Sequence, residues 1–372
     1  MKKILYITTV SRTINAFLVP HIQMLLQEGY RVDIATCIDK PIEASLLEKG
    51  VIVHNIPFGR NPLSLGNLKA FKQLLIIQKQ EKYDVVHVHT PVASLFGRLL
   101  KFRYPKLKTI YTAHGYHFLR GGAKAGWLLY YPIEKMMAKL TDATITINQE
   151  DYDITVNKLK PKKAYLTNGV GLDLSTYKRL SETQVAKKRQ ELGLEPSDFV
   201  IIMIAELNEN KNQIQLIKAM ELLKDSYPDI KAILVGEGDK LPELQQEVNH
   251  RGLNQQIQFL GFRTDINELI NVSNIGVLLS YREGLPRNLM ELMACGRKMI
   301  GTNIRGCRDI IVDETVGAIV SVGDEKGLAK EIEKLYHTRE SEFELSPHLK
   351  SYEVESILGQ LKQIYTDIVR EG

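Results

Sequence analysis

Short apolar runs alternate with segments of helical periodicity along the whole chain, and this alternation restricts the fold more than any other feature. In the first half the apolar runs lie at residues 4–9, 32–36, 51–56, 85–88, 109–113 and 143–147. The helix-period segments between them lie at 17–27, 65–78, 93–102 and 128–140. Strands that are buried on both faces appear as continuous apolar runs, and helical crossovers join parallel neighbours. The pattern therefore predicts a doubly wound α/β sheet.

A second series of the same kind follows a polar helical stretch at 171–195. Its predicted strands lie at 199–205, 232–235, 257–260, 275–279 and 298–301, and its helices at 213–223, 241–249, 266–272, 288–294 and 327–336. With 372 residues the chain has room for two domains. We predict one over 1–170, joined by about 350–372, and one over 171–350, with a final helix at about 353–369. Ligands bind at the carboxyl ends of such sheets, so a cleft between the domains is the expected site.

The charge is unevenly distributed between the two halves. Residues 1–170 carry 24 Lys and Arg against 12 Asp and Glu, and residues 171–372 carry 25 against 32. The basic first half suggests an anionic partner such as membrane headgroups, a phosphorylated lipid or nucleic acid, and a solvated basic surface is the plain alternative.

Cysteine usage and the chain start indicate the compartment. Cys37, Cys295 and Cys307 fit no zinc spacing and favour a reducing environment. Arg12 and Asn15 interrupt the first apolar run too early for a signal peptide, and no stretch has the length of a transmembrane helix. We expect a cytoplasmic protein, peripheral on the inner face of the cell membrane.

The most informative stretch is Ser-Tyr-Arg-Glu-Gly-Leu-Pro-Arg-Asn-Leu-Met-Glu-Leu-Met-Ala-Cys-Gly at 280–296, directly after a predicted strand. Gly284 and Pro286 predict a turn into a helix, with Glu283 at the strand end and Glu291 on the helix. The free amides of Gly284, Leu285 and the helix start can bind an anion, and neighbouring carboxylates can accept hydrogen bonds from sugar hydroxyls. The structural alternative is that Glu283 caps the helix and Glu291 is solvated.

This Glu-x7-Glu pattern, with its Gly-Leu-Pro and Ala-Cys-Gly flanks, resembles the retaining glycosyltransferases of family 4, which have the GT-B fold. The resemblance covers the chain from the first strand to the last helix and is closest to bacterial capsule and exopolysaccharide enzymes. It implies that Glu283 contacts the hydroxyls of the transferred sugar and that Glu291 contacts the ribose. It also implies an N-terminal acceptor-binding domain and a C-terminal nucleotide-sugar-binding domain.

Further landmarks in the second half agree with this resemblance. The loop at 205–212, with Asn208 and Lys211, is similar to the family's diphosphate-binding loop. Glu206, however, stands where an arginine is usual, so either Arg12, Arg282 or Arg287 takes its place or the loop holds the diphosphate more loosely. Gly236 lies in a Gly-x-Gly turn, and Phe262 and Arg263 lie in a segment like the one whose backbone reads the base. The alternatives are a solvated helix-start lysine at Lys211, a tight turn at Gly236 and simple packing for Phe262.

The first half contributes histidines at two predicted strand ends, His87 with His89 and His114 with His117. Such clusters suggest a metal site, but the resemblance implies catalysis without metal. It matches His114 to the family histidine that reaches the donor sugar and puts His117 near the acceptor, while structural roles remain the alternative.

Two more first-half positions complete the expected acceptor side. Asn168 lies in a segment that resembles the one lining the cleft at the domain junction. The loop at 8–15 lacks the paired glycines common in the family, which shifts Arg12 toward binding the acceptor phosphate or replacing the missing arginine.

Together these features predict a retaining, metal-independent enzyme that needs no cofactor beyond its UDP-sugar substrate. The expected acceptor is a saccharide on undecaprenyl diphosphate, and the expected sugar is an N-acetylamino sugar. The basic and apolar segment 97–108 predicts docking on an anionic membrane surface, whereas no nucleic-acid module is evident. A UDP-sugar epimerase of the same fold and a non-catalytic nucleotide-sugar-binding subunit are the alternatives.

Overall fold

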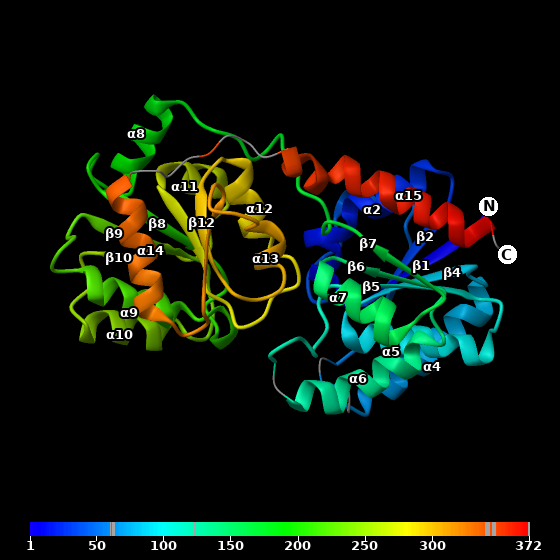
Figure 1. Ribbon diagram of the computed structural model, residues 1–372. Coiled ribbons are helices and arrows are strands. Elements are labelled where there is room, and N and C mark those ends of the chain that lie inside the picture. Colours follow the sequence, from blue (N-terminus) through cyan, green and yellow to red (C-terminus); the bar gives the residue numbers. More distant parts are fainter. Residues whose placement is uncertain (60, 62–63, 123, 339–342, 344–346, 371–372) are drawn as a thin grey trace. The chain divides into compact units, whose positions relative to one another are not determined.

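The chain forms two compact units, each a parallel β-sheet with helices on both faces (Figure 1). This computed structural model describes residues 1–59, 61, 64–122, 124–338, 343 and 347–370. Unit 1 comprises Met1–Gly171 with Tyr352–Gly372, and unit 2 comprises Leu172–Ser351. The predicted α/β class, two Rossmann-like doubly wound domains, is confirmed.

Unit 1 contains seven strands. Its elements are β1 (Lys3–Val10), α1 (Ser11–Thr13), the π-helical turn η1 (Ile14–Leu18), α2 (Val19–Gln27), β2 (Arg31–Cys37), α3 (Ala44–Leu47), β3 (Val53–Asn55), α4 (Gly66–Glu81), β4 (Val85–His89), α5 (Pro91–Arg103), β5 (Lys108–Ala113), α6 (Lys124–Ala138), β6 (Ala143–Thr146), α7 (Gln149–Ile154), the π-helical turn η2 (Thr155–Leu159), β7 (Lys163–Leu166) and α15 (Val354–Arg370).

The strands of unit 1 pair in parallel in the order β3-β2-β1-β4-β5-β6-β7. The order reverses between β1 and β4, since Ile4 pairs with Val32 of β2 on one side and with Val85 of β4 on the other. Successive side chains of a strand point to opposite faces. Leu5 therefore belongs to the core under α4, α5 and α6, and Tyr6 belongs to the core under α2 and α15.

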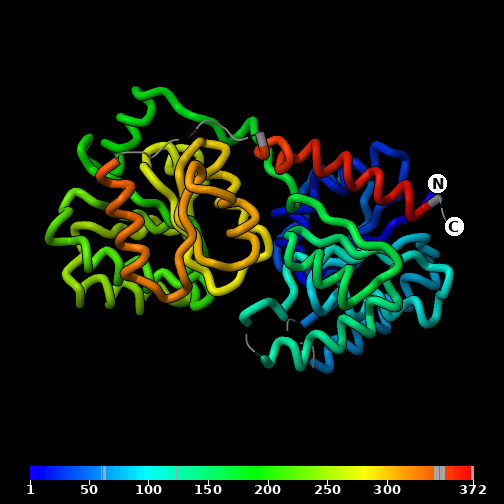
Figure 2. Tube along the Cα trace, viewed as in Figure 1, coloured from blue at the N-terminus to red at the C-terminus, as the bar shows by residue number. Residues whose placement is uncertain are grey.

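The C-terminal helix α15 completes unit 1. Its apolar stripe, including Ile357, Leu361 and Ile364, is buried in the core that α2 also covers. Figure 2 shows this red helix beside the blue N-terminal segment. The hydroxyl of Tyr365 lies 2.6 Å from Nδ1 of His87, so the end of the chain reaches a buried strand residue.

Unit 2 contains six strands. Its elements are α8 (Glu182–Glu191), β8 (Phe199–Ile204), the 3₁₀ turn η3 (Glu209–Lys211), α9 (Gln213–Leu223), β9 (Ile230–Val235), α10 (Leu241–His250), β10 (Ile257–Phe259), α11 (Ile266–Val272), β11 (Ile275–Leu278), α12 (Arg287–Ala294), β12 (Lys298–Thr302), α13 (Cys307–Ile310), β13 (Gly317–Val320) and α14 (Glu325–Thr338), followed by the 3₁₀ segment η4 (Pro347–Tyr352).

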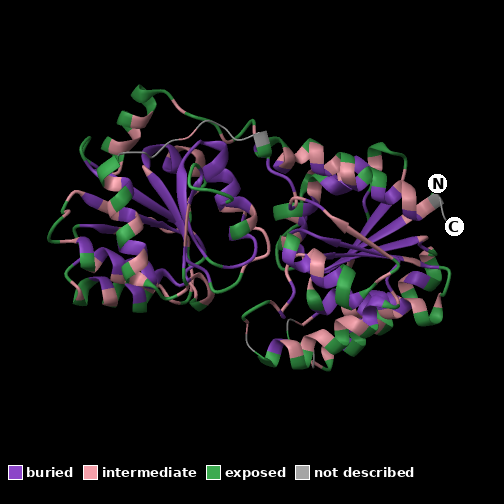
Figure 3. Cartoon of the chain, in the orientation of Figure 1, coloured by how far each residue is buried: buried purple, intermediate pink, exposed green. Residues whose placement is uncertain are grey.

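The second sheet has the order β10-β9-β8-β11-β12-β13, again entirely parallel, and it reverses between β8 and β11. Its strands are buried almost throughout, as Figure 3 shows in purple. Leu216 and Ile217 of α9 and Leu328 of α14 close one face of this core. The loops that follow β8 and β11 therefore lie side by side at the carboxyl edge of the sheet.

Several local predictions were wrong. The expected loop at 8–15 is instead the end of β1 followed by helix from Ser11, and strands β7 and β13 were not predicted. Both missed strands are short edge strands, whose four residues give too little pattern to recognise. Among the described residues, no helix has both the length and the apolar character needed to cross a bilayer.

Candidate active site

Lys211 and Glu283 form an ion pair at the reversal point of the second sheet. Lys211 ends the short turn after β8, and Glu283 lies between β11 and α12. The ammonium Nζ lies 2.6 Å from Oε1 of Glu283, and both side chains are largely enclosed. Reversal points are where doubly wound sheets bind ligands. The sequence-predicted lysine and carboxylate are thus brought together at the place where ligand binding is expected.

Two asparagines fix the loop that carries Lys211. Asn208 caps the turn, since its Oδ1 accepts a hydrogen bond from the Lys211 amide at 3.1 Å. Asn210 ties this loop to the one after β11, because its carbonyl accepts from the Tyr281 amide at 2.8 Å and its side-chain amide donates to the Arg282 carbonyl at 3.0 Å. The backbone thereby holds Lys211 in register with Glu283.

The turn at Glu283 is supported from behind by the loop after β12, which the sequence analysis missed. Arg305 is 1% exposed, and its Nε donates to the Glu283 carbonyl at 2.9 Å. Gly306 has φ +77°, and a Cβ there would lie 2.3 Å from the Gly284 carbonyl oxygen. Only glycine fits this approach, so Gly306 lets the loop press against the Gly284 turn.

Glu291 on α12 is 7% exposed, which rules out the solvated helix carboxylate. The Tyr177 hydroxyl donates to its Oε1 at 2.8 Å, and Arg287 Nε donates to the same oxygen at 3.0 Å. Burial raises the pKa of Glu291, although the hydrogen bonds from Tyr177 and Arg287 oppose the rise. Tyr177 was not predicted, because 114 positions separate it from Glu291 and no local pattern marks it. The N-cap of α12 is Pro286 rather than Glu283, so the capping alternative is also wrong.

Gly236 and Glu206 belong to the loops that follow β9 and β8. Gly236 has φ +144°, and a Cβ would lie 2.1 Å from the Ala205 carbonyl oxygen, so close packing of the two loops demands this glycine. The Glu206 side chain is exposed, while its carbonyl accepts a hydrogen bond from Gln213 at 2.9 Å. The glutamate at the position where an arginine was expected therefore contributes its main chain to the loop.

The other residues predicted to bind the nucleotide differ in their exposure and in their contacts. Phe262 is 71% exposed, so the packing alternative for it is wrong. Arg263 forms a two-bonded ion pair with Asp265 at 2.8 and 2.6 Å, which commits its guanidinium to a neighbour. Gly284 and Leu285 are half-buried in the turn before α12.

In unit 1, His114 follows β5 and is paired with His89 at the end of β4. His89 Nδ1 and His114 Nε2 lie 3.0 Å apart. Burial and the nearby charge of His21 lower the pKa of His114 to about 4, and burial lowers the pKa of His89 well below its ordinary value. Both rings are thus neutral near pH 7. His87 contacts Tyr365 and Thr112 through its two ring nitrogens, which is a structural role.

Thr90 occupies a backbone conformation that is rare for a β-branched residue. Its φ of 62° and ψ of 144° occur directly after His89, at the reversal point of the first sheet. Its hydroxyl lies 2.7 Å from that of Thr9 at the end of β1. Such strain costs on the order of 1–3 kcal/mol and tends to occur at functional sites. No local sequence pattern marks this strain.

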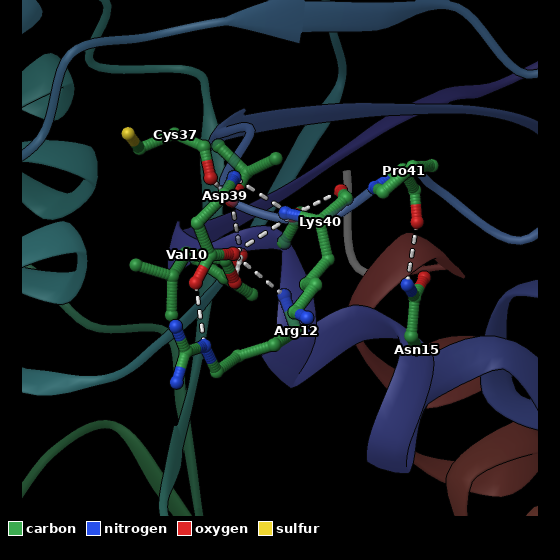
Figure 4. Close-up of polar contacts among 10 residues, drawn as sticks. Val10, Arg12, Asn15, Cys37, Asp39, Lys40 and Pro41 are labelled. Atoms are coloured by element: carbon green, nitrogen blue, oxygen red, sulfur yellow. Dashed lines mark hydrogen bonds and ion pairs between the residues drawn. The ribbon is translucent and has the colours of Figure 1, made fainter.

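The three predicted acceptor-side residues lie after three different strands. Arg12 Nε lies 2.5 Å from Asp39 Oδ2, and Figure 4 shows this pair beside Asn15, which donates to the Pro41 carbonyl. Burial opposes the effect, but hydrogen bonds from Arg12 and Ser11 lower the pKa of Asp39 to about 2. Arg12 is therefore already neutralised by a carboxylate, although its side chain remains more than half exposed.

The other two predicted acceptor-side residues are His117, which follows β5, and Asn168, which follows β7. The His117 ring stacks on Tyr130 of α6 with centroids 4.6 Å apart. Asn168 is half-buried after β7 and precedes Gly169, whose φ is +88°. Within the described part of the chain, no group of three or more His, Cys, Asp or Glu side chains is arranged to hold a metal ion.

Comparison with known proteins identifies this architecture. Residues 18–174 match the family described as Glycosyltransferase Family 4, and residues 184–351 match Glycosyl transferases group 1. The putative glycosyltransferase EpsD of Bacillus subtilis (strain 168) is 36% identical over 91% of this chain and 88% of its own. The UDP-Gal:alpha-D-GlcNAc-diphosphoundecaprenol alpha-1,3-galactosyltransferase of Escherichia coli is 28% identical over 71% of this chain and 69% of its own.

Among solved structures, Anabaena HepE in complex with UDP and glucose superposes with a TM-score of 0.80 at 22% identity, covering 99% of this chain and all of HepE, which shows a common fold. The two Rossmann-like units, with their matched halves, define a glycosyltransferase of the GT-B class. More narrowly, the chain belongs to the family 4 glycosyltransferases and is related to the enzymes of capsule and exopolysaccharide synthesis.

Proposed function

We propose that this glycosyltransferase moves a sugar, an N-acetylamino sugar, from UDP to a saccharide on undecaprenyl diphosphate, with retention of the anomeric configuration and without a metal. The observation that carries the proposal is the Lys211–Glu283 pair at the reversal point of the second sheet. A lysine beside a carboxylate suits a substrate that presents a diphosphate next to sugar hydroxyls.

Lys211 stabilises the departing diphosphate in this proposal, together with the main-chain amides of the Gly284–Leu285 turn. Preorganised donors of this kind contribute roughly 3–4 kcal/mol each to stabilising a transition state. Glu283 accepts hydrogen bonds from sugar hydroxyls, and Arg305 and Gly306 hold its turn in position. The buried Glu291 accepts hydrogen bonds from the ribose, with Tyr177 and Arg287 keeping it oriented.

The chemical step breaks the bond between the anomeric carbon and the β-phosphate oxygen of UDP. A bond from the same carbon to the acceptor oxygen forms on the same face, and the acceptor proton passes to the leaving phosphate. This route needs no external base. In unit 1, His114 is proposed to contact the donor sugar, as a neutral imidazole aligned by His89, because burial keeps its pKa low.

The proposed acceptor follows from the relatives. Two of them are named for transfer to diphosphoundecaprenol-linked sugars. A lipid carrier also implies that the protein works peripherally at the inner face of a membrane.

The decisive experiment offers the purified protein a panel of UDP-sugars with an undecaprenyl-diphosphate-linked monosaccharide and scores products by mass. We expect one donor to extend the acceptor, with an α-linkage seen in the anomeric coupling constant and with full activity in EDTA. A β-product, an absolute need for metal, or epimerised UDP-sugar formed without acceptor would each overturn the corresponding part of the proposal.

A further inference from the structure

A cavity of about 810 Å³ opens at the amino edge of the first sheet. Its walls come from the C-terminal ends of α4 and α5, the segment between α5 and β5, and Val369 of α15. Val85, the first residue of β4, also lines it, so the cavity lies at the other end of this strand from His89. Lys211 and Glu283 belong to unit 2. The cavity is therefore separate from the site described above, and its volume is that of a small-molecule site.

Positive charge surrounds this cavity. Its cations are Lys2, Lys79, Lys82, Arg103, Lys106 and Lys108, and Asp84 is the one acid among its described lining residues. Lys2 pairs with Asp84 at 3.2 Å and neutralises it. Within the described part of the chain, no carboxylate forms an ion pair with four of the others, Lys79, Lys82, Arg103 and Lys106. Unneutralised charges of one sign around a concave surface concentrate their potential inside it.

This surplus of charge is particular to the cavity. A cavity of about 820 Å³ in unit 2 is lined by two arginines and two glutamates, so its charges balance. Cations at helix C-termini offset the helix dipole, which accounts for Lys79 and Arg103 in the last turns of α4 and α5. It does not account for Lys106 in the following segment. The arrangement therefore fits an anionic ligand better than it fits helix capping alone.

The segment 97–108, which the sequence analysis expected to dock on an anionic membrane surface, contributes to this cavity only in part. Arg98 and Leu100 are buried and cannot meet an anion from outside. Arg103 and the residues that follow it line the cavity. The exposed cations of the segment thus gather around a pocket.

An aromatic ring and an unpaired amide oxygen give the cavity further chemistry. The half-buried Tyr104 lines it, with the Arg103 guanidinium carbon 5.9 Å from the ring centroid. Aromatic rings and guanidinium planes are groups on which nucleic bases stack. Gln78, which also lines the cavity, is 5% exposed, and its Nε2 donates to the Tyr83 carbonyl at 3.0 Å. Among the described residues its Oε1 is buried without a partner, so an N–H donor of a ligand would satisfy it.

We propose that this cavity binds a nucleoside polyphosphate at a second site, apart from the donor site. The phosphates contact the unneutralised cations, and the base lies against Tyr104 and donates an N–H group to Gln78. A small molecule is favoured over a protein partner because the cations surround a concave pocket with an aromatic wall. The proposal stands independently of the proposed function.

The test is calorimetric titration of the full-length protein with ATP in EDTA, which keeps the full charge of the nucleotide. Lys79→Gln with Arg103→Gln should weaken ATP binding tenfold or more, since each charged hydrogen bond contributes strongly. Lys69→Gln with Lys72→Gln removes the same charge from exposed positions of α4 outside the cavity and should bind ATP like the wild type. No ATP binding by the wild type, or equal losses in the two variants, would overturn the proposal.

A variant of the donor site distinguishes the two sites. Lys211→Met should leave ATP binding unchanged, and Lys79→Gln with Arg103→Gln should leave UDP binding unchanged. If Lys211→Met abolished ATP binding and the cavity variant did not affect it, ATP would occupy the donor site and the second site would be excluded. The UDP titration thus tests the proposed function separately.

Inorganic tripolyphosphate tests the role of the nucleoside. Tyr104→Leu keeps an apolar side chain but removes the ring, so it should weaken ATP binding roughly tenfold and leave tripolyphosphate binding unchanged. If tripolyphosphate bound the wild type as tightly as ATP, the cavity would be a site for free phosphates and the nucleoside would play no part. Equal circular dichroism and equal thermal unfolding of all variants exclude misfolding as the cause of any loss.

Discussion

Nζ of Lys211 lies 2.6 Å from Oε1 of Glu283, although 72 positions separate the two residues in the chain. The loops after two adjacent strands of the second sheet bring them together. Because the two side chains share one hydrogen bond in a largely enclosed site, each fixes the position of the other. They are expected to act as a unit.

We predict that Lys211→Met and Glu283→Gln each lower kcat by roughly 100- to 1000-fold, and that the double variant is no worse than the poorer single variant. Groups that act as a unit give such non-additive losses. The measurement is steady-state sugar transfer by all three variants. Lys240→Met with Glu243→Gln is the control, since this exposed pair has the same 2.6 Å separation on the surface of the same unit. Independent, multiplying losses at Lys211 and Glu283 would contradict a joint role.

A second prediction concerns the pH dependence of UDP binding. Burial raises the pKa of Glu291, and the ribose is proposed to need its carboxylate form, so affinity should fall as the pH drops through this raised value. Tyr177→Phe removes a hydrogen bond that lowers this pKa, which moves the fall to higher pH. Glu291→Gln should weaken UDP binding tenfold or more and abolish the part of the pH dependence that comes from Glu291.

The prediction is tested by calorimetric measurement of UDP affinity for each variant between pH 5 and 8. Variants are compared at equal pH, so that the protonation of UDP itself cancels. Tyr227→Phe, which loses a hydrogen bond to Glu333 in the same unit, should behave like the wild type. If UDP affinity depended on pH in the same way for Tyr177→Phe and the wild type, Tyr177 would not be lowering the pKa of Glu291.

The contact between Gly306 and the Gly284 turn gives a steric prediction. Gly306→Ala should lower kcat, because the new methyl group would displace the turn that carries Glu283. Gly323 has the same φ of +77° but open space around it. Gly323→Ala therefore introduces the same backbone strain without moving the Gly284 turn. Transfer assays and thermal unfolding of both variants separate the two effects. Equal loss of activity in both would show that strain alone is responsible.

The His89–His114 contact predicts a positioning role for His89. The Nε2 atom of His89 is buried without a hydrogen-bond partner in the described part of the chain, and an unpaired acceptor there is tolerated better than an unpaired donor. His89 thus carries its proton on Nδ1 and donates to His114. His89→Leu should lower kcat roughly 10- to 100-fold with little change in the KM for UDP-sugar.

His89→Asn, whose amide can donate from nearly the same place as Nδ1, should recover most of that kcat. His54→Leu, which removes an imidazole bonded to Tyr83 in the same unit, serves as the control. If the asparagine and leucine variants were equally impaired, the hydrogen bond to His114 would not be the cause.

Stability should fall in mild acid. Burial lowers the pKa of His21 to about 4, and it lowers those of His87 and His89 well below 6.5. An unfolded histidine protonates near pH 6.5, so below this pH the unfolded state binds more protons than the native state. Each such histidine then costs about 1.4 kcal/mol of the unfolding free energy for every pH unit, whereas its full contribution is present above pH 6.5.

Urea unfolding followed by tryptophan fluorescence tests this, because the single tryptophan of the chain, Trp127, lies in unit 1 with these histidines. His21→Asn should show a smaller loss between pH 6.5 and 5, and the exposed His250→Asn should match the wild type. A midpoint that is constant over this range would contradict the prediction.

The comparison of sequence and structure shows what local patterns can reveal. Glu283 and Lys211 were predictable because both lie in the loops that follow apolar strands, and parallel strands end at the same edge. Tyr177, Arg305 and Gly306 were not, since they act through contacts with residues far away in the sequence. Periodicity indicated that α6 is a helix but not which of its sides faces the sheet. The strain at Thr90 depends on tertiary hydrogen bonds that no propensity reports.

The docking of α15 on unit 1 has a consequence for biosynthesis. Helix α15 supplies part of the core between α2 and the first sheet, including Tyr365, which contacts His87. This core therefore stays incomplete until residues 354–370 have left the ribosome. Unit 2 has all of its strands by residue 320 and its core helix α14 by residue 338, so it can complete its core before α15 is available to unit 1. We therefore expect unit 2 to complete its core before unit 1, and the first sheet, complete in its strands but not yet covered by α15, is the species that chaperones would have to protect.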